Sequence, residues 1–215
     1  MLLDQLKIMK RGLEILGMCL GLFALITQFI LMMQNRETDV PETIIRFFGF
    51  FTILTNTLVT LFFISKVFKE TRFLSFLKGG SAFTAITTFI LIVGLVYQTA
   101  LRSVWDPKGL QMVVDELLHT IIPLFFLMYW FLYARLSDME LKSVIKWLVY
   151  PIGYLIFVFI QGAMTDFYPY PFLNVTEIGL SQSLINVGLV TILTLVFMFL
   201  LTVSGKFIVR NKKQF

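Results

Sequence analysis

Charged residues, cysteine and histidine are all scarce in this chain. Only 14% of its 215 residues are Asp, Glu, Lys or Arg, whereas roughly a quarter of the residues of a soluble domain carry charge. The single cysteine, Cys19, excludes an internal disulfide and a thiolate metal cluster. The single histidine, His119, excludes every site that needs two imidazoles. Soluble chemistry is therefore not expected, and neither is a cofactor.

Long hydrophobic runs fill most of the chain. Hydrophobic residues make up 58% of it, and a helix needs about 20 mostly apolar residues to cross a bilayer. None of the runs shows the alternation of a membrane β-barrel. The sequence therefore predicts an all-α membrane protein, one domain over residues 1–215, with six transmembrane helices at about residues 12–33, 47–65, 80–101, 117–134, 144–163 and 182–204.

Basic residues are concentrated in alternate segments between the spans. Of the 18 Lys and Arg residues, three lie in the N-terminal segment, four in the second connection, three in the fourth and four in the tail. Because Lys and Arg are enriched on the cytoplasmic side, both termini are predicted to be cytoplasmic. These basic residues are distributed over four segments near the anionic headgroups. We therefore expect the net charge of +5 to interact with the membrane and not with nucleic acid. We expect a multi-pass protein of a cell membrane, and the style of the sequence suggests a bacterial inner membrane.

Polar residues inside the second span are candidates for a functional site, because polar groups in hydrocarbon cost free energy unless they are paired or face the bundle interior. Thr52, Thr55, Asn56 and Thr60 recur at helical spacing and form one stripe. Threonine hydroxyls in membrane helices often bond to a carbonyl one turn earlier and merely pack an interface. Asn56 is different, since a side-chain amide has four hydrogen-bonding positions to satisfy.

The fourth span opens with two acids and the histidine. Asp115 and Glu116 precede His119 by four and three residues, so either carboxylate could lie on its helical face. A carboxylate bonded to one imidazole nitrogen leaves the other nitrogen free to act as a base. The alternatives are a divalent metal site, for which no second histidine is present, and a simple interhelical hydrogen bond. On the predicted topology Thr52 and His119 both lie within about one to two helical turns of the outer surface.

More polar and aromatic residues are expected on the outer side. Tyr170 and Asn174 lie in a proline-rich aromatic connection, and Asn186 enters the sixth span at the same level. Such a connection is typical of an aromatic anchor at the headgroups, and could alternatively fold as a lid over the bundle. Asn56 and Asn186 are candidate hydrogen-bond donors to an oxyanion.

Three short motifs follow one another along the chain: Phe51-Thr52-Ile53 opens the second span, His119-Thr120 with Pro123 opens the fourth, and Tyr170-Pro171-Phe172-Leu173 precedes the sixth. In this order they resemble the androgen-induced membrane hydrolases and their bacterial relatives, which have six spans and use a Thr and a His as a catalytic pair. The resemblance implies Thr52 as nucleophile and His119 as general base. It also implies lipid-ester substrates, such as fatty-acid esters of hydroxy fatty acids. Thr55 lies in the same motif and remains a second candidate for the nucleophile.

The chemistry of the residues is compatible with such an enzyme. A threonine hydroxyl is a poor nucleophile at neutral pH and needs a base within hydrogen-bond reach, and His119 is the only imidazole. The sequence thus favours an intramembrane threonine-type hydrolase of lipid esters. The alternatives are a lipid acyl transferase and a non-enzymatic transporter or receptor. Transporters often have broken helices and internal repeats, whereas here Gly94 is the clearest mid-span interruption.

Overall fold

The structure is a computed structural model that describes residues 1–68 and 72–212. Within these residues it is helical, without β-strands. Five helical segments are long and apolar enough to cross a membrane: Asp4–Gln34, Ala82–Leu101, Leu110–Tyr133, Leu141–Thr165 and Val175–Asn211. A sixth crossing is present if the bent pair Val40–Gly49 and Phe51–Val67 is one span. The all-α fold is therefore confirmed for the described residues, and five or six of its helical segments suit the predicted spans. Two of the basic residues counted above, Lys69 and Lys213, lie outside the described residues.

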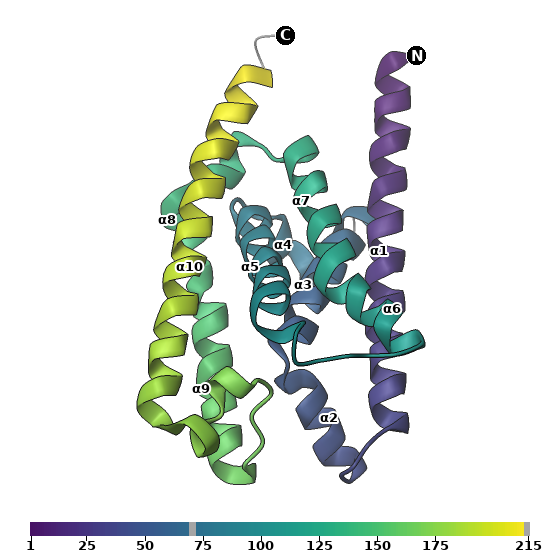
Figure 1. Ribbon diagram of the computed structural model, residues 1–215. Coiled ribbons are helices and arrows are strands. Elements are labelled where there is room, and N and C mark those ends of the chain that lie inside the picture. Colours follow the sequence, from purple (N-terminus) through teal and green to yellow (C-terminus); the bar gives the residue numbers. More distant parts are fainter. Residues whose placement is uncertain (69–71, 213–215) are drawn as a thin grey trace.

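Ten α-helices are labelled in Figure 1, joined by short 3-10 and π-helical segments. In chain order the elements are α1 (Leu2–Gln34), α2 (Val40–Gly49), α3 (Phe51–Val67), η1 (Arg72–Leu74), α4 (Ser75–Lys78), α5 (Ala82–Val96), η2 (Tyr97–Leu101), α6 (Leu110–Glu116), η3 (Leu117–Ile121), α7 (Ile122–Tyr133), η4 (Leu136–Met139), α8 (Leu141–Ile145), η5 (Lys146–Leu148), α9 (Val149–Thr165), η6 (Pro171–Leu173) and α10 (Val175–Lys212). The span that contains α5 is the most enclosed of the five, while those of α1 and α10 are mostly exposed and suited to face lipid. The start of α1 and the end of α10 lie at the same end of the bundle (Figure 1).

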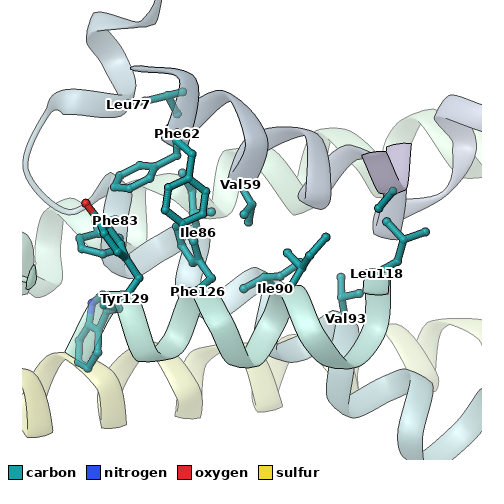
Figure 2. Close-up of a cluster of buried hydrophobic side chains, with 14 of the residues drawn as sticks. Val59, Phe62, Leu77, Phe83, Ile86, Ile90, Val93, Leu118, Phe126 and Tyr129 are labelled. Atoms are coloured by element: carbon teal, nitrogen blue, oxygen red, sulfur yellow. The ribbon is translucent and has the colours of Figure 1, made fainter. Parts of the chain in front are cut away.

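The core is an aromatic and aliphatic cluster between α3, α5 and α7 (Figure 2). The ring of Phe62 stacks on Phe83 with 4.7 Å between centroids and meets Phe126 edge-on at 5.3 Å. Edge-to-face and offset contacts of this kind add to the free energy of area burial. This cluster fixes α3 against α5 and α7. The polar residues discussed below lie towards one end of the bundle that these helices form.

The second span differs from its prediction as a continuous helix over residues 47–65. The helix is interrupted at Phe50, whose backbone is extended (φ −83°, ψ 123°), and α2 and α3 meet there at 74°. Asp39 caps α2 by accepting a hydrogen bond from the Glu42 N–H at 2.9 Å, so α2 has its own start. A Cβ at Gly49 would lie 3.1 Å from Oε1 of Gln161, so a glycine lets α9 approach the bend. Thr52 consequently lies in the first turn of α3.

The sixth helix also departs from its predicted limits. It begins at Val175 instead of 182 and has a kink at Gly179, whose φ of 78° is readily adopted by glycine. Asn174 caps this start, because its Oδ1 accepts hydrogen bonds from the N–H groups of Thr176 at 3.2 Å and Glu177 at 3.4 Å.

Candidate active site

A cavity of about 730 Å³ lies at the end of the bundle away from the start of α1 and the end of α10. Its wall comes from the end of α1, from α2, the first turn of α3, η2, α6 and η3, and from the connection before η6. This volume is in the usual range of small-ligand sites. Four of the polar residues singled out in the sequence line it: Thr52, Asp115, His119 and Tyr170.

Thr52, His119 and Asp115 form a connected row of side chains at this cavity. Oγ1 of Thr52 lies 3.3 Å from Nε2 of His119. Nδ1 of His119 lies 2.9 Å from the backbone oxygen of Asp115 and 3.4 Å from its Oδ1. The side chains of His119 and Asp115 are only 10% and 8% exposed, so a charge that forms on the imidazole would have the Asp115 carboxylate as its nearest counter-charge.

The contact with the backbone of Asp115 determines which nitrogen of a neutral His119 carries the proton. A carbonyl oxygen only accepts hydrogen bonds, so Nδ1 must be the N–H that donates to it. Nε2 then has a free lone pair and faces Oγ1 of Thr52. This is the tautomer in which a histidine can take a proton from a hydroxyl.

The position of Thr52 in its helix explains why its hydroxyl faces His119. Hydroxyls further along α3 bond to their own helix: Thr57 donates to the Ile53 carbonyl and Thr60 to the Asn56 carbonyl, each at 2.7 Å. Thr52 is in the first turn, directly after the bend at Phe50, and has no carbonyl of a preceding turn of α3 to bond. The bend therefore leaves the Thr52 hydroxyl available to a partner outside α3.

Tyr170 covers Thr52 from the connection between α9 and α10. Its hydroxyl accepts a hydrogen bond from the Thr52 N–H at 3.2 Å and lies 3.3 Å from Oγ1 of the same residue. Burial raises the pKa of the Tyr170 phenol above its ordinary value, which keeps the hydroxyl protonated. The helix dipole favours negative charge at the first turn of α3. The protonated Tyr170 phenol lies beside this turn and can donate a hydrogen bond there.

Asn56 braces the site instead of pointing into it. Its side-chain N–H groups donate to the carbonyls of Thr52 at 2.9 Å and Leu118 at 3.2 Å. The amide is fully buried and ties the first turn of α3 to the residue before His119. Its amide hydrogens are used in these two contacts, so Asn56 holds the two segments together and does not donate into the cavity.

Two π-helical segments, η2 and η3, lie against each other beside the cavity. The Tyr97 ring in η2 stacks on the His119 ring in η3, with 4.0 Å between centroids and 14° between planes. Gly94 permits this approach, since a Cβ there would lie 2.9 Å from the His119 carbonyl oxygen. Gly94 itself is inside α5, so the interruption expected there is wrong and the irregularity lies one turn later. Single-turn π segments are frequent at functional sites.

The remaining residues expected at the site lie around it. Thr55 is buried, with its hydroxyl 2.9 Å from that of Tyr150. Glu116 is an ion-pair partner of Arg102 and accepts from Thr120. Asn186 donates to the Phe172 carbonyl at 2.9 Å and accepts from Gln182. The structure thus unites Thr52 with His119 and Asp115, and places Thr55, Glu116 and Asn186 in supporting contacts.

The alternative metal site is not assembled in the part of the chain that the structure describes. No group of three His, Cys, Asp or Glu side chains is arranged there to hold an ion. Glu116 is turned to Arg102, away from the pair formed by Asp115 and His119.

Sequence reasoning did not single out Tyr97. The sequence contained one indication of it. Tyr97 and Gln98 are polar residues near the end of the third span, at the same predicted depth in the membrane as His119. The stacking partner of a histidine on another helix cannot be found from such a signal without knowing which helices are neighbours.

Comparisons of the chain with models of known protein families, with curated proteins and with solved structures gave no match. The resemblance to androgen-induced membrane hydrolases therefore remains a prediction from its three motifs.

Proposed function

We propose that this protein is an intramembrane threonine-type hydrolase of lipid esters. The observation that carries the proposal is the 3.3 Å contact between Oγ1 of Thr52 and Nε2 of His119, with Asp115 behind the imidazole, at the wall of a 730 Å³ cavity. A nucleophile, a base and a group that orients the base are the parts that covalent ester hydrolysis requires. The motif resemblance described above supports the same assignment of Thr52 and His119.

In the proposed reaction Oγ1 of Thr52 attacks the ester carbonyl carbon and its proton passes to Nε2 of His119. The tetrahedral intermediate then loses the alcohol, whose oxygen takes the proton from Nε2. A water molecule next attacks the acyl-threonine ester, giving its proton to Nε2, and the fatty acid leaves as the proton returns to Oγ1. If a lipid hydroxyl replaces water in the second half, the same residues perform acyl transfer.

The oxyanion would be stabilised next to the first turn of α3. The Tyr170 hydroxyl lies at this turn and accepts a hydrogen bond from the Thr52 N–H at 3.2 Å, so its own O–H is the group that would donate to the oxyanion. The positive end of the α3 dipole adds to this stabilisation. Donors of this kind act most strongly in a site that excludes water.

The cavity lining favours a lipid over a polar ester. Most of the exposed lining area is apolar, with contributions from Leu31, Met32, Phe47, Leu101 and Leu118. Trp105 is at the rim and is 53% exposed, as is usual for an aromatic residue at the headgroup level. A lipid ester could therefore reach Thr52 with its chains still in an apolar environment. The proposed location is a cell membrane, with the cavity on the outer side.

Covalent trapping tests this proposal. Purified protein in detergent is treated with a fluorophosphonate, and the modified residue is identified by peptide mass spectrometry. We expect a phosphonyl adduct on Thr52 that Thr52→Ala and His119→Gln abolish. Thr57→Ala is the matched control, because the Thr57 hydroxyl is engaged with its own helix, and it should label as the wild type does. An adduct on Thr55, or labelling that survives in Thr52→Ala, would contradict the assignment.

A non-enzymatic lipid-binding protein is the second candidate. One observation favours it: the large cavity has apolar walls that include Leu31, Met32 and Phe47, and such walls suit a bound lipid whether or not a reaction follows. The two candidates predict different fates for a bound lipid ester. If the wild type and Thr52→Ala both bind the ester and it is recovered intact from both, the protein is a lipid-binding protein and not a hydrolase.

A further inference from the structure

A second, smaller cavity shares Thr52 as a lining residue with the first. It has a volume of about 130 Å³ and lies between α5, α9 and α10. Thr52, Leu101 and Tyr170 line both cavities, so both cavities reach the proposed nucleophile. We call this second cavity the α5/α9/α10 groove.

The groove is a narrow apolar slot about two helical turns long. Its lining runs from Phe89 to Val96 on α5, from Leu148 to Leu155 on η5 and α9, and from Val187 to Thr194 on α10. Each stretch corresponds to roughly 10 Å of helix. An apolar cavity of about this volume stays free of water and binds small hydrocarbons.

The two threonine hydroxyls that α10 brings to the groove are bonded to their own helix. Thr191 donates to the Val187 carbonyl and Thr194 to the Val190 carbonyl, each at 2.8 Å. Both threonines therefore present mainly their methyl groups to the groove. Ile152 on the other wall is 54% exposed, so the groove reaches the surface of α9, where a transmembrane helix meets lipid chains.

The position of His119 decides which half of an ester the groove can hold. His119 lines the large cavity and is not among the described residues that line the groove. The leaving alcohol must take its proton from His119, so its oxygen has to leave towards the large cavity. The acyl chain, which stays bonded to Thr52 after that step, must extend the other way.

We propose that the α5/α9/α10 groove binds the acyl chain of the substrate, while the alcohol half occupies the large cavity. This inference rests on the proposed function. It adds that acyl-chain length is selected by the residues of the groove that lie away from Thr52. It also gives water a path to the acyl-threonine ester. The alcohol leaves the large cavity, which water can then enter, while the acyl chain remains in the α5/α9/α10 groove.

Chain-length selectivity of a groove-filling variant tests the inference. Val190 lines the groove, and Val190→Phe should block its inner part. The preceding residue, Leu189, is 61% exposed and does not line the groove, so Leu189→Phe is the matched control. The probes are p-nitrophenyl acetate, which needs no groove, and p-nitrophenyl decanoate. Both are assayed with purified protein in detergent.

For Val190→Phe we expect the ratio of decanoate to acetate hydrolysis to fall about tenfold or more. The acetate rate should stay within about twofold of the wild type, and Leu189→Phe should leave both rates unchanged. An unchanged ratio of decanoate to acetate hydrolysis in Val190→Phe overturns the inference. The groove would then hold a lipid chain of the bilayer or no ligand.

A second variant guards against misfolding of the first. Val190→Ala enlarges the groove without a clash, and should shift the preferred acyl chain to a greater length. If Val190→Phe loses both activities, an unchanged length preference in Val190→Ala overturns the inference. Failure of the wild type to cleave even the acetate is a different result, because it overturns the proposed function itself.

Discussion

The His119 imidazole is held flat against the Tyr97 phenol ring, 4.0 Å away, by two π-helical segments from different spans. Stacking fixes the plane of the imidazole, and the hydrogen bond from Nδ1 to the Asp115 carbonyl fixes its rotation within that plane. With both fixed, Nε2 has one direction left to face, and Thr52 lies there. The site is thus pre-organised by packing.

Asp115 acts on His119 with both its backbone and its side chain, and the two effects can be separated. Asp115→Asn keeps the carbonyl that holds the tautomer but removes the negative charge 3.4 Å from Nδ1. We expect kcat for an ester to fall by about 10- to 100-fold, since only the stabilisation of the imidazolium is lost. Glu116→Gln is the control, because Glu116 is paired with Arg102. Equal losses in the two variants would exclude a specific role for Asp115.

Gly94 is required for the close approach of α5 to His119. In Gly94→Ala the new Cβ would lie 2.9 Å from the His119 carbonyl oxygen, so one helix must shift. We expect a destabilisation of about 1–3 kcal/mol together with a loss of fluorophosphonate labelling. Gly153→Ala is the matched helical control, since its Cβ would meet nothing within 4 Å. Thermal unfolding in detergent compares the two, and an equally mild effect of both would contradict the close packing.

Tyr170 should contribute to stability in a pH-dependent manner. Burial raises the pKa of its phenol above the ordinary value of about 10, so the folded state favours the neutral form. That contribution is complete below pH 10 and is lost as the pH rises through the pKa of the folded state. The stability advantage of the wild type over Tyr170→Phe should therefore shrink above about pH 10. Chemical unfolding at pH 8 and at higher pH measures it, and a constant difference would show that the phenol is not desolvated.

The predicted orientation can be tested with single cysteines in a Cys19→Ser background. Asp4 near the start of α1 and Asp106 in the connection between η2 and α6 have side chains that are 71% and 92% exposed. With both termini cytoplasmic, a membrane-impermeant maleimide added to intact cells should label Asp106→Cys and spare Asp4→Cys. After lysis both should be labelled. The reverse pattern in intact cells would put the cavity on the cytoplasmic side.

Apolar length and composition are sufficient to predict the helical membrane class, because both are local properties of the chain. The break at Phe50 was not predictable in this way, since Phe50 lies inside the apolar run of residues 47–65 and the close approach of Gln161 to Gly49 joins distant residues. The limits of α10 were missed for a local reason, since Asn174 caps a helix that begins before the apolar run.

The site was predictable residue by residue but not as an assembly. Thr52 and His119 were identified as polar residues at one level, and their 3.3 Å contact depends on which helices pack together. The choice between Asp115 and Glu116 was open, because both offsets suit a regular helix. In the structure the π-helical segment begins at Leu117, just after both acids, and only Asp115 faces the imidazole.

The most direct test of the central claim is hydrolysis of a branched fatty-acid ester by the purified wild type, Thr52→Ala, His119→Ala and Thr57→Ala, each checked for folding. The account predicts turnover by the wild type and by Thr57→Ala, and a loss of at least about 100-fold in the other two. Absence of turnover in the wild type across several lipid esters, or undiminished turnover in folded Thr52→Ala, would contradict it.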